Sequence, residues 1–170
     1  MSVNQYQQHV FVLPEDEANL QIANGFHLQV PLNRQRQMQV LPVARGWPRV
    51  LELFQSVHVS EMERNFRRSM VVLIDFDGKV ERLTKAKAVI PGNLADRVFI
   101  LGAFTTPEAL RQANLGTYEN IGLAMAKDCR EETNIIWGHE LLQHNSSELD
   151  RLREHVRPIL FPSDAWARPD

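Results

Sequence analysis

The sequence predicts an α/β fold, a mainly parallel four-stranded sheet with helices on both faces and extra C-terminal helices. Short apolar segments alternate along the chain with longer segments of helical character. This alternation is typical of parallel strands joined by helical crossovers. After about residue 105 the chain has helical character throughout, so we expect the last helices to cover one edge of the sheet.

Four apolar segments are predicted as strands. They cover residues 9–13, 38–44, 70–75 and 96–102. The run before Asp75 contains no polar residue, as expected of a strand buried on both faces. Pro42 in the second segment argues against a central position in the sheet, because proline has no N–H to donate to a neighbouring strand.

Helices are predicted between and after these strands. They cover residues 17–25 (extending no further than residue 30), 49–56, 60–68, 108–114, 118–132, 135–143 and 145–156. Ser60 and Glu63 have the spacing of a capping box. Thr106 and Pro107 suit the cap and first residue of the helix that follows them. The polar segment 79–87 lies between the third and fourth predicted strands, where the alternation of elements leaves a place for a further helix.

The composition is that of a globular protein with a single domain. The 170 residues are 44% hydrophobic and 24% charged, which is enough for a sizeable core. We expect a core over about residues 9–104, a helical extension over 105–161 and a tail over 162–170. No apolar run approaches the ~20 residues of a membrane helix. The N-terminus lacks the basic and apolar regions of a signal peptide.

The net charge of −2 predicts no overall attraction to nucleic acid or to an anionic membrane. A nucleic-acid partner would therefore need a local basic patch. Arginines before Asp75 could contact phosphates, although a solvated face is the simpler interpretation: Arg34, Arg36, Arg45, Arg49, Arg64, Arg67 and Arg68. The single cysteine, Cys129, excludes an internal disulfide and indicates a reducing cytoplasm. We expect it to be buried and structural.

The segment 70–78 carries the main functional signal. Its apolar run ends in Asp75, Phe76, Asp77 and Gly78. Residues i and i+2 of a strand lie on the same side, roughly 6.6 Å apart. We therefore expect both carboxylates to face the crevice at the carboxyl end of the sheet. A solvated turn that carries two aspartates is the alternative.

The first predicted strand is also followed by acidic residues, Glu15 to Glu17. In a parallel sheet the carboxyl ends of the strands share one edge, so Glu15 or Glu17 would lie beside Asp75 and Asp77. Three carboxylates at one edge favour a site for Mg²⁺ or Mn²⁺. The alternative is that these acids only stabilise the N-terminus of the following helix.

This order of motifs resembles the TOPRIM (topoisomerase–primase) domain family over about residues 9–101. The resemblance implies a Rossmann-like core in which a glutamate acts as general acid or base and an Asp-x-Asp motif holds Mg²⁺. The matching positions here are Glu15, Asp75 and Asp77. Small stand-alone members resemble nucleases, some of them in phage defence.

The same residues also resemble the first motif of haloacid-dehalogenase-type phosphatases. That resemblance implies that Asp75 is a nucleophile and Asp77 an acid or base. However, Lys79 stands where the motif has Thr or Val. Thr105 and Thr106 could imitate the second motif, but no later predicted strand ends in an acidic pair. The phosphatase therefore ranks second.

Two other signals have simpler interpretations. His139 and His144 are five residues apart, which on a helix separates them by roughly 140°. The zinc-protease pattern needs a spacing of four, so no zinc site is predicted. Trp47 could stack on a base, but a role in covering the core is simpler.

The sequence thus predicts a Mg²⁺-dependent enzyme that hydrolyses phosphodiesters. Glu15, Asp75 and Asp77 are its expected catalytic and metal-binding residues, with Glu17 as a reserve acid. A non-catalytic TOPRIM-like module is the alternative of a different class. It would bind another protein through the helical C-terminal third, and the absence of excess basic charge favours it.

Overall fold

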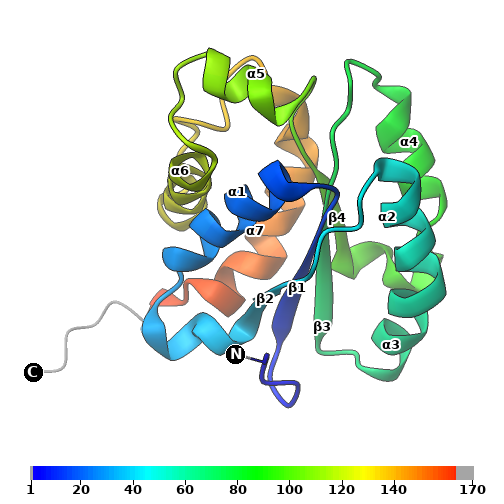
Figure 1. Ribbon diagram of the computed structural model, residues 1–170. Coiled ribbons are helices and arrows are strands. Elements are labelled where there is room, and N and C mark those ends of the chain that lie inside the picture. The colour runs from blue at the N-terminus through cyan, green and yellow to red at the C-terminus, as the bar shows by residue number, and fades with distance from the viewer. Residues whose placement is uncertain (1, 164–170) are drawn as a thin grey trace, which may run out of the picture.

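A four-stranded parallel sheet lies between two layers of helices in the computed structural model, which describes residues 2–163 (Figure 1). The strands are β1 (His9–Pro14), β2 (Met38–Val40), β3 (Arg68–Leu73) and β4 (Val98–Leu101). Their spatial order is β2-β1-β3-β4, and every neighbouring pair is parallel. The predicted fold class is therefore confirmed, and β2 lies at an edge, as Pro42 indicated. The predicted tail lies outside the described residues except for residues 162 and 163.

Helices cover both faces of the sheet. They are α1 (Glu17–Leu28), α2 (Trp47–Leu53), α3 (Val59–Arg64), α4 (Glu81–Ala88), α5 (Pro107–Gln112), α6 (Tyr118–Glu131) and α7 (Ser146–Leu160). On one face lie α1, α6 and α7, and on the other α2, α3 and α4 (Figure 1). Within the described residues, no helix is long and apolar enough to cross a membrane.

Alternation along the strands divides the interior into two cores. Successive strand residues point to opposite faces, so Val10 and Val12 pack with α1, α6 and α7. Phe11 and Leu13 pack with the second layer, on the far side of the sheet. All six residues of β1 are buried, which fits a central strand covered on both faces.

The second layer fills one open place in the predicted order and corrects one prediction. The polar segment 79–87, between the third and fourth strands, contains most of α4, because a narrow apolar stripe that includes Leu83 and Ala86 packs against the core. No capping box forms at Ser60, because α2 continues into α3 through one π-helical turn, Phe54–His58. Ser60 therefore lies inside a helix, and its hydroxyl donates to the Val57 carbonyl at 3.4 Å.

The predicted helix over 135–143 is also wrong. Asp128, near the end of α6, accepts hydrogen bonds from the backbone N–H groups of Ile136 and Trp137, at 2.8 and 3.1 Å. The Thr133 hydroxyl donates to the same carboxylate at 2.5 Å. These bonds hold the segment in turns. Only its end, Gln143–Asn145, is helical, as a short 3₁₀ helix.

The C-terminal helix α7 closes the free edge of β4, as expected. The buried Glu148 carboxylate accepts the Ile100 N–H at 3.0 Å. Asn145 accepts the Gly102 N–H and donates to its carbonyl, at 3.1 and 2.9 Å. Lys87 and Arg151 neutralise Glu148, at 2.5 and 2.9 Å. Side chains of α7 thus take the place of a fifth strand.

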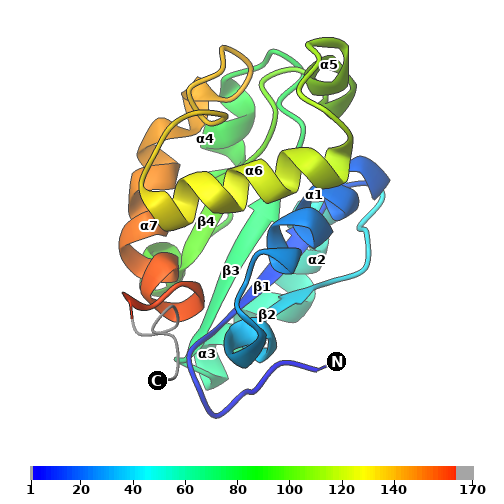
Figure 2. The same cartoon turned by 90° about the vertical axis from the view of Figure 1, so that its left-hand side faces the viewer.

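In the first layer α1 and α6 lie side by side (Figure 2) and approach closely at two glycines. A Cβ at Gly25 would lie 2.1 Å from the Glu119 carbonyl oxygen. A Cβ at Gly122 would lie 1.9 Å from the Ile22 carbonyl oxygen. Both distances are far inside van der Waals contact, so this packing requires glycine at the two positions.

Gly122→Ala should therefore lower the free energy of unfolding by roughly 1–3 kcal/mol, because the added methyl group forces α1 and α6 apart. Gly92→Ala is the matched control, since nothing lies within 4 Å of a Cβ at that position. Urea denaturation of both variants measures the difference. Equal stabilities would contradict the close packing described here.

Candidate active site at the carboxyl edge of the sheet

The candidate site lies where the chain connections diverge. The crossover from β1 leads to β2 on one side, and the crossover from β3 leads to β4 on the other. The carboxyl ends of β1 and β3 therefore form a topological switch point, where open α/β sheets bind ligands. Glu15 follows β1, and Asp75 and Asp77 follow β3.

A hydrogen bond joins the two strand ends directly. Glu15 Oε2 accepts the backbone N–H of Asp75 at 2.7 Å. The Glu15 N–H in turn donates to the Leu73 carbonyl at 2.9 Å, which extends the pairing of the strands by one residue. Glu17 is exposed in the first turn of α1. Glu15, and not Glu17, is therefore the glutamate that contacts the Asp75 turn.

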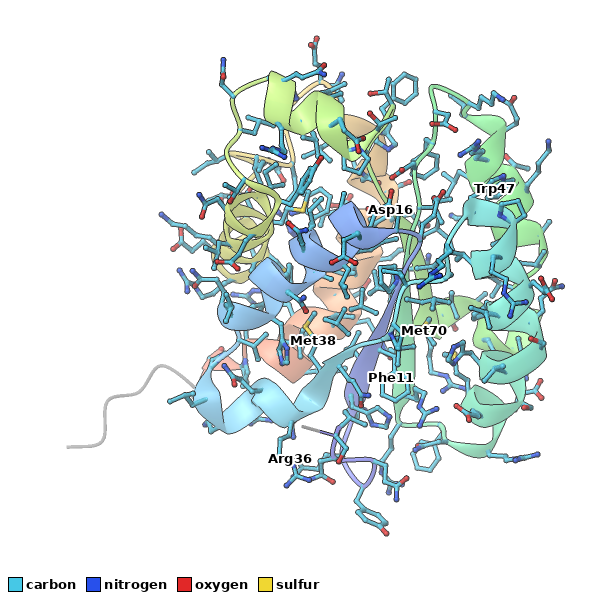
Figure 3. The ribbon with its side chains drawn as sticks, in the orientation of Figure 1. Phe11, Asp16, Arg36, Met38, Trp47 and Met70 are labelled. Atoms are coloured by element: carbon cyan, nitrogen blue, oxygen red, sulfur yellow. The ribbon has the colours of Figure 1, made fainter. Side chains whose placement is uncertain are left out.

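Asp75 is buried, with 8% of its surface exposed. Its Oδ1 accepts a hydrogen bond of 2.9 Å from Nδ2 of Asn19, a buried residue of α1. The same Nδ2 donates to Oδ1 of Asp16 at 3.1 Å. Asp16 also caps α1 by accepting the Asn19 N–H, and it lies at the carboxyl end of the sheet (Figure 3). The first turn of α1 thus orients the Asp75 carboxylate.

The sequence predicted that Asp75 and Asp77 lie on the same side of one strand. The structure does not show this arrangement. Because β3 ends at Leu73, the two aspartates belong to a turn in which Asp77 has a φ of +49°. Its N–H donates to the Thr105 carbonyl at 3.0 Å. Its side chain is 44% exposed and forms a 2.6 Å ion pair with Arg82 of α4. Another nitrogen of Arg82 donates to the Asp75 carbonyl at 2.6 Å.

Burial and repulsion between neighbouring carboxylates raise the pKa values of two acids at this edge. The pKa of Asp75 is raised to about 7, mainly by burial and further by the charges of Asp16, Glu15 and Glu108, which together outweigh the opposing Asn19 hydrogen bond. Burial also raises the pKa of Glu15, and Asp16 and Asp77 add to this effect. The hydrogen bond from Asp75 and the charge of Arg82 act in the opposite direction on Glu15. A bound cation would relieve these penalties.

The carboxylates of Glu15, Asp75 and Asp77 fit a Mg²⁺ ion that is bound by only a few protein ligands. Within residues 2–163, no group of three or more His, Cys, Asp or Glu side chains is arranged to hold a metal ion. Mg²⁺, however, is usually bound by one or two carboxylates together with waters and substrate phosphates. One carboxylate oxygen of Asp75 and one of Glu15 accept hydrogen bonds, and one oxygen of Asp77 pairs with Arg82. The second oxygen of each carboxylate has no partner among the described residues.

The remaining candidates form no described hydrogen bond with the carboxylates of the site. Cys129 is fully buried, as predicted, and burial raises the pKa of its thiol to about 12. His139 lies in the turns after α6, where its Nδ1 accepts the Leu141 N–H at 3.1 Å. His144 packs against Phe76 and Phe104, with ring centroids 4.9 and 5.4 Å away. The two histidines therefore serve in packing and turn geometry.

The arginines near one another in sequence do not form one patch. Arg68 begins β3, and Arg36 lies at the opposite end of the sheet from Asp16 (Figure 3). Arg68 pairs with Glu61 at 2.7 Å and lies over the Phe11 ring. Arg34 also precedes β2, and Arg64 and Arg67 also precede β3, at the amino ends of their strands. Of the seven arginines named above, those that follow a strand are Arg45 and Arg49.

Three residues of the site were not singled out from the sequence: Asn19, Arg82 and Glu108. Asn19 could have been noticed as a polar residue between apolar positions of an amphipathic helix. Arg82 belongs to α4, a helix for which the sequence predicted a place in the order of elements but no residue range. Glu108 follows β4 in the first turn of α5 and influences the pKa of Asp75 only through space.

The chain matches no protein-family model, no curated protein and no solved structure at a significant level.

The raised pKa of Asp75 predicts that the stability of the metal-free protein falls with pH. The folded state keeps a proton on Asp75 up to about pH 7, whereas the unfolded chain releases it near pH ~3.9. This stabilisation is full below the unfolded pKa and is lost as the pH rises through the folded pKa. Asp75→Asn cannot ionise, so at pH 8 it should be more stable than wild type, by about 1–3 kcal/mol.

Urea denaturation in EDTA at pH 4, 6 and 8 measures this effect. The advantage of Asp75→Asn should shrink towards pH 4. A wild-type protein whose stability relative to Asp75→Asn did not change with pH would show that folding does not raise the pKa of Asp75.

Proposed function

We propose that the protein is a Mg²⁺-dependent, TOPRIM-like phosphodiesterase that acts on nucleic acid. The observation that carries this proposal is the contact between Glu15 and the Asp75 turn at the switch point of the sheet. Two carboxyl groups with raised pKa values are held there, on strand ends 60 residues apart in sequence. Perturbed carboxyl groups in a ligand-binding crevice are typical of catalytic sites.

Asp75 and Asp77 are the residues that would hold Mg²⁺, with Glu15 beside them. When bound, the ion would polarise a phosphoryl oxygen and lower the pKa of a bound water. Asn19 fixes the orientation of the Asp75 carboxylate through its 2.9 Å hydrogen bond. Glu15 has one oxygen anchored by the Asp75 N–H, and burial raises the pKa of its carboxyl group, which favours a role in proton transfer. Glu15 therefore takes a proton from the attacking water or returns one to the leaving oxygen.

Glu15→Gln should reduce nuclease activity by about 10²-fold or more, because it cannot exchange a proton. Glu17→Gln is the matched control, since Glu17 is an exposed acid on the adjoining turn, and it should keep wild-type activity. The assay follows cleavage of circular DNA and of single-stranded RNA with Mg²⁺, Mn²⁺ or EDTA. A wild type no more active than Asp75→Ala/Asp77→Ala would refute the proposed activity.

One observation favours the second candidate, a non-catalytic TOPRIM-like module that binds another protein. Arg82 already supplies a positive charge to Asp77 at 2.6 Å, as a structural replacement for a metal would. Calorimetry with Mg²⁺ separates the two functions, because the module has no need of the cation. The phosphatase alternative would instead hydrolyse an aryl phosphate and lose this activity in Asp75→Asn.

A further inference from the structure

Arg82 lies at the acidic edge and contacts both aspartates of the turn after β3. It lies in the first turn of α4, and its side chain is 13% exposed. One terminal nitrogen donates to the Asp75 carbonyl and the other pairs with Asp77 Oδ2, both at 2.6 Å. The guanidinium carbon lies 5.1 Å from the centre of the Trp47 ring. These contacts with the turn after β3 and with α2 hold a planar cation at the edge of the proposed metal site.

The chemistry of this cation suits a phosphate. A guanidinium group presents its N–H donors in a rigid fork that matches two phosphate oxygens. One arm of the Arg82 fork is held by an uncharged backbone carbonyl, and the other by an exposed carboxylate. The Asp77 side chain is 44% exposed, against 13% for Arg82, so solvent reaches the carboxylate side of this ion pair and a phosphate can replace Asp77 as the partner of this arm.

Mg²⁺ and Arg82 compete for the same carboxylate. Asp77 cannot serve both fully, because a divalent cation at Asp77 would lie close to the guanidinium and repel it. A phosphate anion removes the conflict, since it supplies negative charge to the cation and to Arg82 together. The geometry therefore favours joint binding of Mg²⁺ and phosphate over binding of Mg²⁺ alone.

We propose that Arg82 binds the substrate phosphate, and that Asp77 exchanges Arg82 for Mg²⁺ when substrate and metal bind together. The inference rests on the proposed metal-dependent function and adds a role for a residue outside the three predicted acids. Under this inference, the ion pair between Arg82 and Asp77 holds the guanidinium in place until the phosphate binds. The substrate class is a phosphodiester whose oxygens contact Mg²⁺ and Arg82 together.

Calorimetry on Arg82→Gln, Arg82→Lys and wild type tests the exchange, with Mg²⁺ alone and then with inorganic phosphate at saturating Mg²⁺. Arg82→Gln should bind Mg²⁺ roughly threefold more tightly, because a competing charge is gone. The same variant should bind phosphate about tenfold more weakly, because charged hydrogen bonds are lost. Arg82→Lys should keep the wild-type affinity for Mg²⁺ but lose phosphate affinity, because lysine lacks the fork.

Arg49→Gln is the matched control, since Arg49 is an exposed arginine of α2 that pairs with Glu52 at 2.7 Å. It should keep both wild-type affinities. A purely structural role for Arg82 would weaken both ligands in Arg82→Gln, and an idle side chain would change neither, so either result overturns the exchange while leaving the metal site intact. A wild type that binds no Mg²⁺ would refute the proposed function itself.

Discussion

The parallel pairing of β1 with β3 is the contact on which the rest of the structure depends. Six residue pairs, from His9 with Arg68 to Pro14 with Leu73, fix the register of these two central strands. This register places Glu15 against Asp75, although 60 residues separate them in sequence. A slip of one residue would turn every side chain of a strand to the opposite face, which would exchange the two cores and break up the acidic edge.

The acidic edge carries an energetic penalty that the surrounding elements reduce. Burying carboxyl groups near one another disfavours their charged forms, as the raised pKa values of Glu15 and Asp75 indicate. The fold offsets part of this cost with the Asn19 amide, the Asp75 N–H and the Arg82 guanidinium. Each of these groups comes from a segment next to a strand end. The penalty that remains is what a cation and an anionic substrate would relieve.

The helical C-terminal part completes the sheet and does not merely pack beside it. Glu148 bonds to the backbone of β4, and Asn145 to that of Gly102 just after it, and these groups would otherwise form an unpaired edge. The charge of Glu148 is balanced by Lys87 from the end of α4 and by Arg151. The helix α7 therefore connects the first helical layer to the second across β4. The extension and the α/β core share one set of buried contacts.

The sequence by itself determined the strands and the acids that follow them. Apolar runs ended by proline, glycine or aspartate located β1, β3 and β4, and alternation of strand and helix predicted a parallel sheet. Local signals of this kind act over a few residues, so they also located α1 and α6. They gave no bounds for α4, whose charged residues conceal a narrow apolar stripe. They failed at 135–143, where Asp128 holds turns through bonds to Ile136 and Trp137.

Only the tertiary structure decided which groups meet at the site. It selected Glu15 over Glu17, because the register with β3 brings the Asp75 N–H to Glu15. It placed Asp77 in a left-handed turn bound to Arg82, since β3 ends two residues before Asp75. It also brought Asn19 to Asp75. These contacts join residues far apart in sequence or depend on where a strand ends, and both are set by packing rather than by local pattern.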